Sequence, residues 1–402
     1  MTNGTKSGAA NDAGRSASTK HGLILLLAAV MPPMAIISLV PVIPLLMKEF
    51  SAVEGFQFLV PIAVTIPALC VALFSPVAGW LSDRAGRKNL LVLALLLYAA
   101  IGVVPYFLSD LKQIIVARVI LGMGEAVIMT VATALIGDYF KGKERERWVA
   151  LQIATVAISA IVLIAVGGIL GELFGARGPF LMYLLAIPVA LLAAFVLFEP
   201  TCLEQASSAS EDKLPLSLIL PLLGTTLFVG IIFYTMMVKL GAILGLTADL
   251  SPGKIGAIGA AANVGVAAGS FLFGRFKGAS GPMLVLVGLV LAAVGYLGAG
   301  LSVSLTVTSL AVVIAALGFG MLLPTMLTWV LQLLPENVRG RGTGLWTGVF
   351  FFGQFFAPLL AVALQSKLGG LENVLLLFAG LCIAGALVAT AKLKDSTSLL
   401  AE

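Results

Sequence analysis

The sequence predicts an all-α membrane protein whose twelve transmembrane helices form two pseudo-symmetric six-helix bundles. Three observations lead to this fold class. Of the 402 residues, 60% are hydrophobic and only 11% are charged, whereas a soluble domain has roughly 25% charged residues. The apolar residues form a succession of long runs, and glycines of the first half recur in the second. The composition excludes a soluble protein, because too few charged side chains are available to face water.

Transmembrane helices are expected wherever about 20 consecutive residues are mostly apolar, because a hydrocarbon core about 30 Å thick requires that length. The twelve expected spans are residues 22–46, 56–81, 89–108, 113–137, 148–170, 179–198, 216–240, 253–274, 282–301, 306–333, 342–365 and 371–391. Prolines within spans are tolerated in membrane bundles and are expected to bend these helices. They are Pro41, Pro44, Pro67, Pro76, Pro188, Pro324 and Pro358.

The longest connection, residues 199–215, divides the spans into two groups of six. An internal repeat supports this division. Gly122 and Gly124 recur 196 residues later as Gly318 and Gly320, and Gly79 recurs 190 residues later as Gly269. The expected organisation is a disordered cytoplasmic tail (1–20), an N-terminal bundle (21–199), a cytoplasmic central loop (200–215), a C-terminal bundle (216–392) and a cytoplasmic C-terminal tail (393–402).

The distribution of basic residues predicts the orientation. With both termini on one side, 17 of the 24 lysines and arginines lie in the tails and loops of that side, and five lie on the other. The positive-inside rule then places both termini in the cytoplasm. We expect a monomeric, multi-pass protein of a bacterial inner membrane.

The sequence lacks the residues that several functional classes require. The three cysteines, Cys70, Cys202 and Cys382, are far apart, and His21 is the single histidine. No metal site, cofactor or catalytic triad is therefore expected, and the chain is not predicted to be an enzyme. The basic residues are scattered over short loops, which argues against nucleic acid as a partner. The sequence contains no phosphate-binding loop motif, so ATP is not expected to be the energy source.

The most specific stretch joins the second and third spans and reads Gly-Trp-Leu-Ser-Asp-Arg-Ala-Gly-Arg-Lys from Gly79 to Lys88. It resembles the signature G-x-L-A-D-R-x-G-R-K that the major facilitator superfamily carries at this place, and it departs only at Ser82. The resemblance implies a secondary transporter with two six-helix halves, and it covers the whole chain. A basic loop that only fixes the orientation is the alternative interpretation.

The resemblance also implies a conformational latch at this loop. Its expected members are Gly79, Asp83, Arg84, Gly86, Arg87, Lys88 and Asp138. In the family, the acid and the second arginine of the motif interact with an acid at the inner end of the fourth helix, where this chain has Asp138. The implied role is to stabilise the outward-open state and to release as the halves rock. Alternatively, Asp138 is a solvated acid at a helix end.

The fourth span contains two charged residues, Arg118 and Glu125, in a stretch similar to the family pattern R-x-x-x-G-x-G-x-A. They share one helix face about 10 Å apart, so direct contact is not expected. Glu125 is the one carboxylate well inside a span and is the expected proton carrier, with Arg118 as its partner in coupling. The alternative is structural: Arg118 bonded to main-chain carbonyls and Glu125 neutral and packed.

Other polar or aromatic residues within spans are candidates for the wall of a substrate cavity, together with Arg118 and Glu125. They are Gln152, Tyr234, Lys239, Asn263, Trp346 and Gln354. Hydrogen bonding between helices is an equally good explanation for the amides and the tryptophan. Lys239 either lines the cavity or extends its ammonium towards the membrane surface.

Two transport functions remain open. The first is proton-coupled export of amphiphilic or aromatic small molecules, as in the drug and proton antiporters of the superfamily, although the fifth span ends Gly-Gly-Ile-Leu-Gly without their Gly-Pro. The second is proton-coupled import or facilitated movement of organic anions or lysolipids. The fourth span also resembles the spinster branch, whose acid in the first helix is missing here. The expected partners are a small-molecule substrate, protons and the lipid bilayer.

Overall fold

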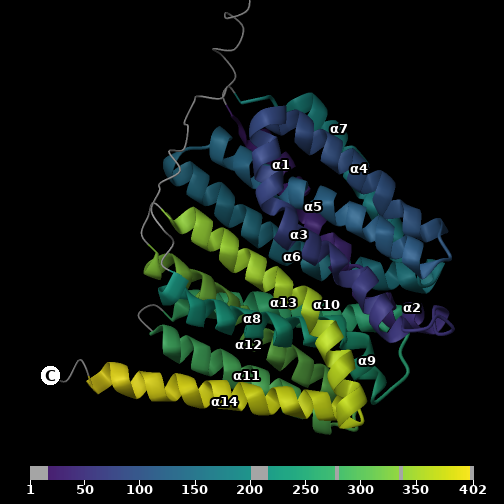
Figure 1. Ribbon diagram of the computed structural model, residues 1–402, viewed down its shortest axis with the longest axis vertical. Coiled ribbons are helices and arrows are strands. Elements are labelled where there is room, and N and C mark those ends of the chain that lie inside the picture. The colour runs from purple at the N-terminus through teal and green to yellow at the C-terminus, as the bar shows by residue number, and fades with distance from the viewer. Residues whose placement is uncertain (1–16, 201–215, 277–279, 335–337, 399–402) are drawn as a thin grey trace, which may run out of the picture.

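The computed structural model describes residues 17–200, 216–276, 280–334 and 338–398, and its regular elements are helices (Figure 1). The first half contains α1 (Thr19–Ile37), η1 (Val40–Val42), α2 (Ile43–Glu49), α3 (Phe56–Ala85), α4 (Arg87–Phe107), α5 (Leu111–Tyr139), α6 (Gly142–Phe174), η2 (Gly178–Leu185) and α7 (Ala186–Val196). The second half contains α8 (Leu216–Val238), α9 (Leu240–Gly245), α10 (Pro252–Arg275), α11 (Gly281–Leu301), α12 (Leu305–Leu333), α13 (Arg339–Leu368) and α14 (Leu371–Ser398).

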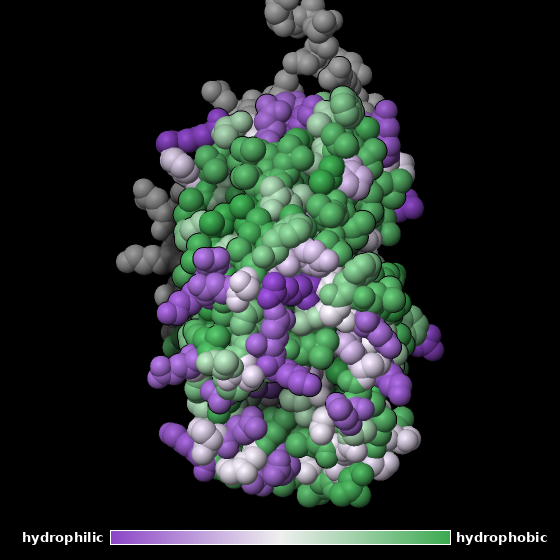
Figure 2. Space-filling view, turned by 90° about the vertical axis from the view of Figure 1, so that its right-hand side faces the viewer, coloured by the Kyte–Doolittle hydropathy of each residue, from purple (hydrophilic) through white to green (hydrophobic). Residues whose placement is uncertain are grey.

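Among the described residues, twelve helical segments are long and apolar enough to cross a membrane, which confirms the predicted number. We call the end of the molecule where α1 begins and α14 ends the terminal face; it lies on the left of Figure 1. The other end, which carries α2 and α9 on the right of Figure 1, is the opposite face. Figure 2 views the opposite face, where hydrophilic side chains gather across the middle and lower parts.

Several predicted boundaries need correction. The first span is not one helix, because α1 stops at Ile37 and a 3-10 turn at Pro41 separates it from α2. The seventh span stops at Val238, and the chain resumes as α9 after Lys239. In contrast, Pro67 lies within the continuous helix α3. In a membrane, neighbouring groups can satisfy the carbonyl that a proline leaves free, so a proline need not end the helix.

The predicted tails and central loop stay predictions, and the structure gives only the ends of the helices that border them. The N-terminal tail was expected to extend to residue 20, but α1 already begins at Thr19; residues 1–16 lie outside the described part. The C-terminal tail was expected from residue 393, but α14 continues to Ser398, because a helix can extend beyond the apolar segment into water. Of the central loop, residues 201–215 lie outside the described part.

Each half has its own apolar core. One cluster of buried side chains comes almost entirely from α1 to α7 and the other from α8 to α14. In the first, the buried Tyr98 of α4 donates its hydroxyl to the Met31 carbonyl of α1 at 2.5 Å. In the second, the buried Tyr296 of α11 makes the same kind of bond to the Ile232 carbonyl of α8. The third and first spans of each half are thus joined in the same way, as expected for a duplicated six-helix unit.

The glycine repeat does not mark equivalent contacts. Gly122 of α5 packs on α3. In the second half, Gly320 of α12 packs on α10, the equivalent of α3, whereas Gly318 packs on α11. The offset of 196 residues pairs Gly122 with Gly318, whereas Gly320 makes the equivalent contact. Two glycines two residues apart on a helix face different neighbours.

Gly122 offers a test of the packing between α3 and α5. A Cβ atom there would lie 2.7 Å from the Pro67 Cα and from the Cys70 Cβ, whereas a Cβ at Gly124 of the same helix would lie 3.9 Å from its nearest neighbour. We expect Gly122→Ala to destabilise the protein by about 1–3 kcal/mol, because the helices must move apart. Gly124→Ala is the matched control and should be neutral or slightly stabilising. Thermal unfolding in detergent measures both, and equal melting temperatures would contradict the packing.

Candidate functional site

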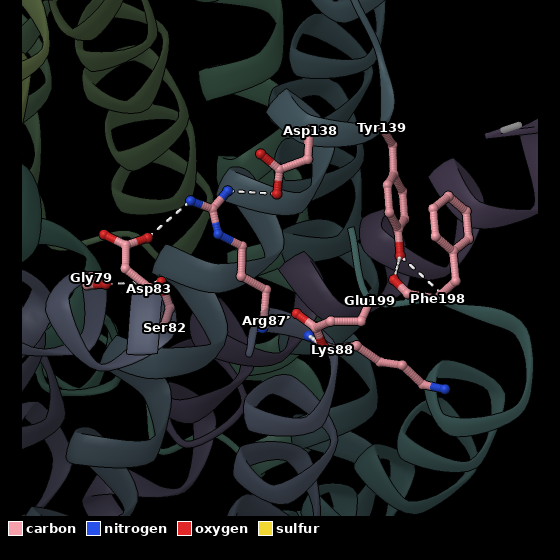
Figure 3. Close-up of polar contacts among 9 residues, drawn as sticks. All are labelled: Gly79, Ser82, Asp83, Arg87, Lys88, Asp138, Tyr139, Phe198 and Glu199. Carbon is pink, nitrogen blue, oxygen red and sulfur yellow. Dashed lines mark hydrogen bonds and ion pairs between the residues drawn. The ribbon is translucent and has the colours of Figure 1, made fainter. Parts of the chain in front are cut away.

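The loop between α3 and α4 brings three charged side chains together at the terminal face (Figure 3). Arg87 donates from Nη1 to Asp138 Oδ2 at 2.5 Å and from Nη2 to Asp83 Oδ1 at 2.9 Å. The side chains of Arg87 and Asp138 are 24% and 28% exposed, whereas that of Asp83 is 65% exposed. The pair with Asp138 is therefore the better enclosed of the two. The trio named from the sequence does assemble.

The remaining loop residues have different surroundings. Gly86 has a φ of +86°, a left-handed conformation that glycine adopts without strain, and it lets α4 start directly after α3. Ser82 donates to the Gly79 carbonyl of its own helix at 2.9 Å, so the departure from the family motif is accommodated locally. Arg84 lies over the Trp80 ring, 4.1 Å from its centroid, and not in the charged trio.

Glu199, the first residue of the expected connection between the halves, completes this cluster. Its carboxylate accepts hydrogen bonds from the main-chain N–H groups of Arg87 and of Lys88, the latter at 3.0 Å. These are the first residues of α4, which has no acidic residue in its first turn. A helix that begins with two basic residues is stabilised by an external anion at its N-terminus. That local charge pattern is the signal that could have pointed to a missing acid.

Phe198 fixes the same segment in place. The Tyr139 hydroxyl donates to the Phe198 carbonyl at 2.5 Å and accepts from the Phe198 N–H at 3.1 Å. The two rings stack with centroids 4.6 Å apart. Because Tyr139 directly follows Asp138, the end of the sixth span is attached to the charged trio from both sides (Figure 3).

The trio joins helices of the first half only. Asp83 belongs to α3, Arg87 to α4 and Asp138 to α5. Moreover, the trio is formed while α6 and α10, from different halves, are in contact at the opposite face. The expected role of the trio, a latch that stabilises the outward-open state and releases as the halves rock, stays a prediction. The contacts of the trio hold the terminal ends of three helices of one half together.

The second charged group lies deep in the first half. Arg118 of α5 is 1% exposed. Its Nε donates to the Ala63 carbonyl at 2.9 Å, and its Nη2 donates to the Val64 carbonyl at 2.9 Å and to the Ala35 carbonyl at 2.6 Å. Its Nη1 donates to the Tyr183 hydroxyl of η2. Arg118 is thus bonded to main-chain carbonyls, as in the structural alternative, and it does not line an open cavity here.

Two of these carbonyls lack their normal helical partners. The Ala63 carbonyl would accept from the N–H of residue 67, but that residue is a proline and has none. The Ala35 carbonyl would accept from Leu39, whose N–H bonds to Ile36 instead because α1 ends there. An unpaired carbonyl inside a membrane costs several kcal/mol. Arg118 replaces the missing donor for Ala63, and for Ala35 it does so together with the Tyr183 hydroxyl, which donates to the same carbonyl at 3.1 Å.

Glu125 does not pair with Arg118. Its side chain is 2% exposed, and among the residues that the structure describes its Oε2 finds no hydrogen-bond partner. Arg118 of the same helix, Cys70 of α3, Tyr98 of α4, Tyr183 of η2 and Tyr234 of α8 lie within electrostatic range of it. Tyr234 belongs to the second half and packs against both cores. Glu125 therefore lies at the boundary between the two halves.

Across this boundary, α13 presents an aromatic and polar face. Trp346, Phe350 and Gln354 follow one another at helical spacing. The Trp346 and Phe350 rings stack with centroids 5.9 Å apart, and Tyr234 lies 5.3 Å from Phe350. In the described part of the chain, Trp346 Nε1 and Gln354 Oε1 are, with Glu125 Oε2, the buried side-chain polar atoms that lack a hydrogen-bond partner.

The other predicted wall residues are not gathered here. Gln152 of α6 donates to Thr133 of α5 at 3.1 Å, towards the terminal face. Asn263 donates to the Gly259 carbonyl of its own helix at 2.9 Å. Lys239 lies at the break between α8 and α9 and is 8% exposed. The printed contacts link Glu125 to Tyr234, and Tyr234 through Phe350 to Trp346, with Gln354 one turn further along α13. Gln152, Asn263 and Lys239 have the separate surroundings just described.

A sequence profile described as Major Facilitator Superfamily matches residues 25–247 and 216–400, which is nearly the whole chain. The chain belongs to the major facilitator superfamily. This superfamily consists of membrane transporters and not of enzymes. The charged trio at the α3–α4 loop and the two six-helix halves are thus features of a member of this family.

Several characterised members are similar to this chain. A class H tetracycline resistance protein of Pasteurella multocida is 27% identical over 192 residues, 48% of either chain. The chain thus spans about half the length of this relative. Multidrug resistance protein 2 of Bacillus subtilis is 27% identical over 343 residues, 80% of this chain and 83% of that protein.

The fold also matches solved structures of the superfamily. A bacterial homologue of the human lysosomal transporter Spinster, in an inward-facing and unoccupied conformation, superposes with a TM-score of 0.77. The match covers 94% of this chain and 99% of that chain at 19% identity. At this identity the likeness shows the common fold.

The unequal exposure of the two ion pairs predicts unequal effects of their removal. We expect Asp138→Asn to lower stability by up to about 1 kcal/mol, because partly exposed pairs contribute about that much. Asp83→Asn should cost less, because the Asp83 carboxylate is mostly solvated. Thermal unfolding in detergent measures both, alone and combined with Arg87→Gln. The Asp138 effect should disappear in the Arg87→Gln background, and an effect that persists there would contradict the pair.

Proposed function

We propose that this chain is a secondary active transporter that works by alternating access and exports amphiphilic or aromatic small molecules in exchange for protons. The observation that carries the proposal is Glu125, a buried carboxylate at the boundary between the halves with an oxygen that lacks a hydrogen-bond partner in the described part of the chain. An intramembrane acid is costly and is usually retained for function.

The surroundings of Glu125 support a proton carrier. An ionised carboxylate buried without a partner is unfavourable, so a proton is retained while the site is closed. The face of α5 that carries Glu125 becomes more exposed towards the terminal face, from 2% at Glu125 through the half-buried Met129 to the exposed Thr133. In the proposed cycle, the proton would leave Glu125 along this face towards the terminal face when the site opens.

The substrate class follows from the face of α13. Stacked aromatic rings bind planar apolar groups, and Trp346 Nε1 and Gln354 Oε1 offer one donor and one acceptor without a protein partner in the described residues. These groups suit an uncharged or weakly charged aromatic compound with polar substituents. The names of the resistance proteins similar to this chain agree with export.

The import of organic anions is the weaker candidate. It requires Arg118 or Lys239 as an anion partner, but the Arg118 guanidinium is already bonded to three carbonyls and to the Tyr183 hydroxyl. Binding a substrate anion would require breaking those bonds and leaving the Ala63 carbonyl unpaired.

We further propose that the terminal face is cytoplasmic, that the membrane is a bacterial inner membrane and that the transporter acts as a monomer. The basis for the orientation is that 17 basic residues lie in the expected tails and loops of the terminal side and only five in those of the other side. Single cysteines at Lys6, Lys112 and Lys394 test it in a chain that lacks its native cysteines. An impermeant thiol reagent added to intact cells should label only residue 112, and all three after permeabilisation. Labelling of residue 6 or 394 in intact cells would contradict the proposed orientation and place the terminal face outside the cell.

Glu125→Gln tests the proton coupling. Glutamine keeps the shape of the side chain but cannot release a proton, so uptake of tetracycline into liposomes under an imposed pH gradient should fall to under about a tenth of the wild-type rate. Exchange of the same probe without a gradient should persist, because it bypasses the return of the empty site.

The matched control is Glu144→Gln, an exposed acid in the first turn of α6 that should change neither rate. Gradient-driven uptake by Glu125→Gln at near wild-type rates would remove Glu125 from the mechanism. The remaining explanation would then be a uniporter.

A further inference from the structure

The two halves touch through their main chains at the opposite face, where α6 of the first half passes α10 of the second. A Cβ atom at Gly168 would lie 2.6 Å from the Pro252 carbonyl oxygen and 3.0 Å from the Gly256 Cα. A Cβ at Gly256 would in turn lie 3.0 Å from the Gly168 Cα. Glycine is therefore needed on both helices for this approach, which closes the opposite face between the halves.

One turn beyond Gly168, the carboxylate of Glu172 crosses from one half to the other. Its Oε2 accepts the N–H of Gly253 at 3.1 Å and the hydroxyl of Ser251 at 3.3 Å. Both donors lie at the N-terminus of α10, where the N-cap Ser251 makes no capping bond with its own side chain. Glu172 therefore supplies the cap that α10 lacks, and its charge matches the positive end of the helix dipole.

Gly253 is part of the same arrangement. A Cβ atom at this position would overlap Glu172 Oε2, so the carboxylate reaches the N–H only because residue 253 has no side chain. In contrast, the ion pair of Arg177 with Glu49 on the same face, with Nε and Oε1 2.9 Å apart, joins two segments of the first half. That pair does not change when the halves separate.

We propose that Glu172 is a gating residue that holds the opposite face closed by capping α10 across the interface between the halves. The inference rests on the proposed alternating-access cycle. When the opposite face opens, α6 and α10 must part, and the carboxylate and the helix N-terminus then bind water instead of each other. An interaction made in only one of two states shifts the equilibrium towards that state. Removing it therefore favours the state that is open at the opposite face.

The test measures the distance between the halves and not transport. Spin labels at Lys112→Cys in the first half and Val303→Cys in the second, both exposed at the opposite face, report the separation by pulsed electron spin resonance. The full-length chain, with its native cysteines replaced, is studied in liposomes without substrate. Glu172→Gln should raise the ratio of long to short distances about threefold, as expected for the loss of a charge at a helix N-terminus.

Gly253→Ala keeps the charge but blocks its approach, and it should produce the same shift. Glu49→Gln is the matched control, since it removes an acid from the same face without touching the interface, and it should leave the distribution unchanged. The proposal is overturned if neither Glu172→Gln nor Gly253→Ala changes the distribution, or if Glu49→Gln changes it equally. Because no substrate or pH gradient is present, a failed export assay does not affect this result.

Discussion

The first half depends on one constraint, that a main-chain carbonyl inside a membrane must have a hydrogen-bond donor. Pro67 removes the donor for Ala63, and the end of α1 removes the donor for Ala35. Arg118 donates to both carbonyls and so joins α1, α3 and α5, and the Tyr183 hydroxyl of η2 also donates to Ala35. The break in the first helix is stable for this reason, and Glu125 on the same face of α5 keeps an oxygen without a hydrogen-bond partner in the described part of the chain.

The features that could be predicted from the sequence are those that depend on residues close together in the chain. The apolar runs gave the number and order of the spans, and the α3–α4 loop gave the trio of Asp83, Arg87 and Asp138. A side chain whose hydrogen-bond partner is a distant main-chain atom leaves no such pattern in the sequence. Pro67 indicates that the carbonyl four residues before it is free, but nothing in the sequence names an arginine 55 residues further on as its donor. Glu199 and Glu172 were missed for the same reason, because each caps a helix that is distant in the chain.

The two halves share a fold but differ in chemistry at their boundary. Both use a buried tyrosine to join the third span to the first. The first half presents the acid Glu125 at the boundary, whereas the second presents aromatic rings and the uncharged Trp346 and Gln354. In the proposed cycle, proton and substrate would thus be held by different halves. Rocking would change the distance between the two ligands, which is a direct way to couple them.

The anchoring of Phe198 and Glu199 has a consequence for how the chain could be divided. The last residues of the first half are bound to Tyr139 and to the start of α4, so that half is closed by contacts within itself. None of these contacts uses the connecting segment that follows. A transporter cut within this segment and produced as two polypeptides would keep the end of its first half in place. The two fragments could then meet through the faces of α6 and α10, as subunits of a heterodimer do.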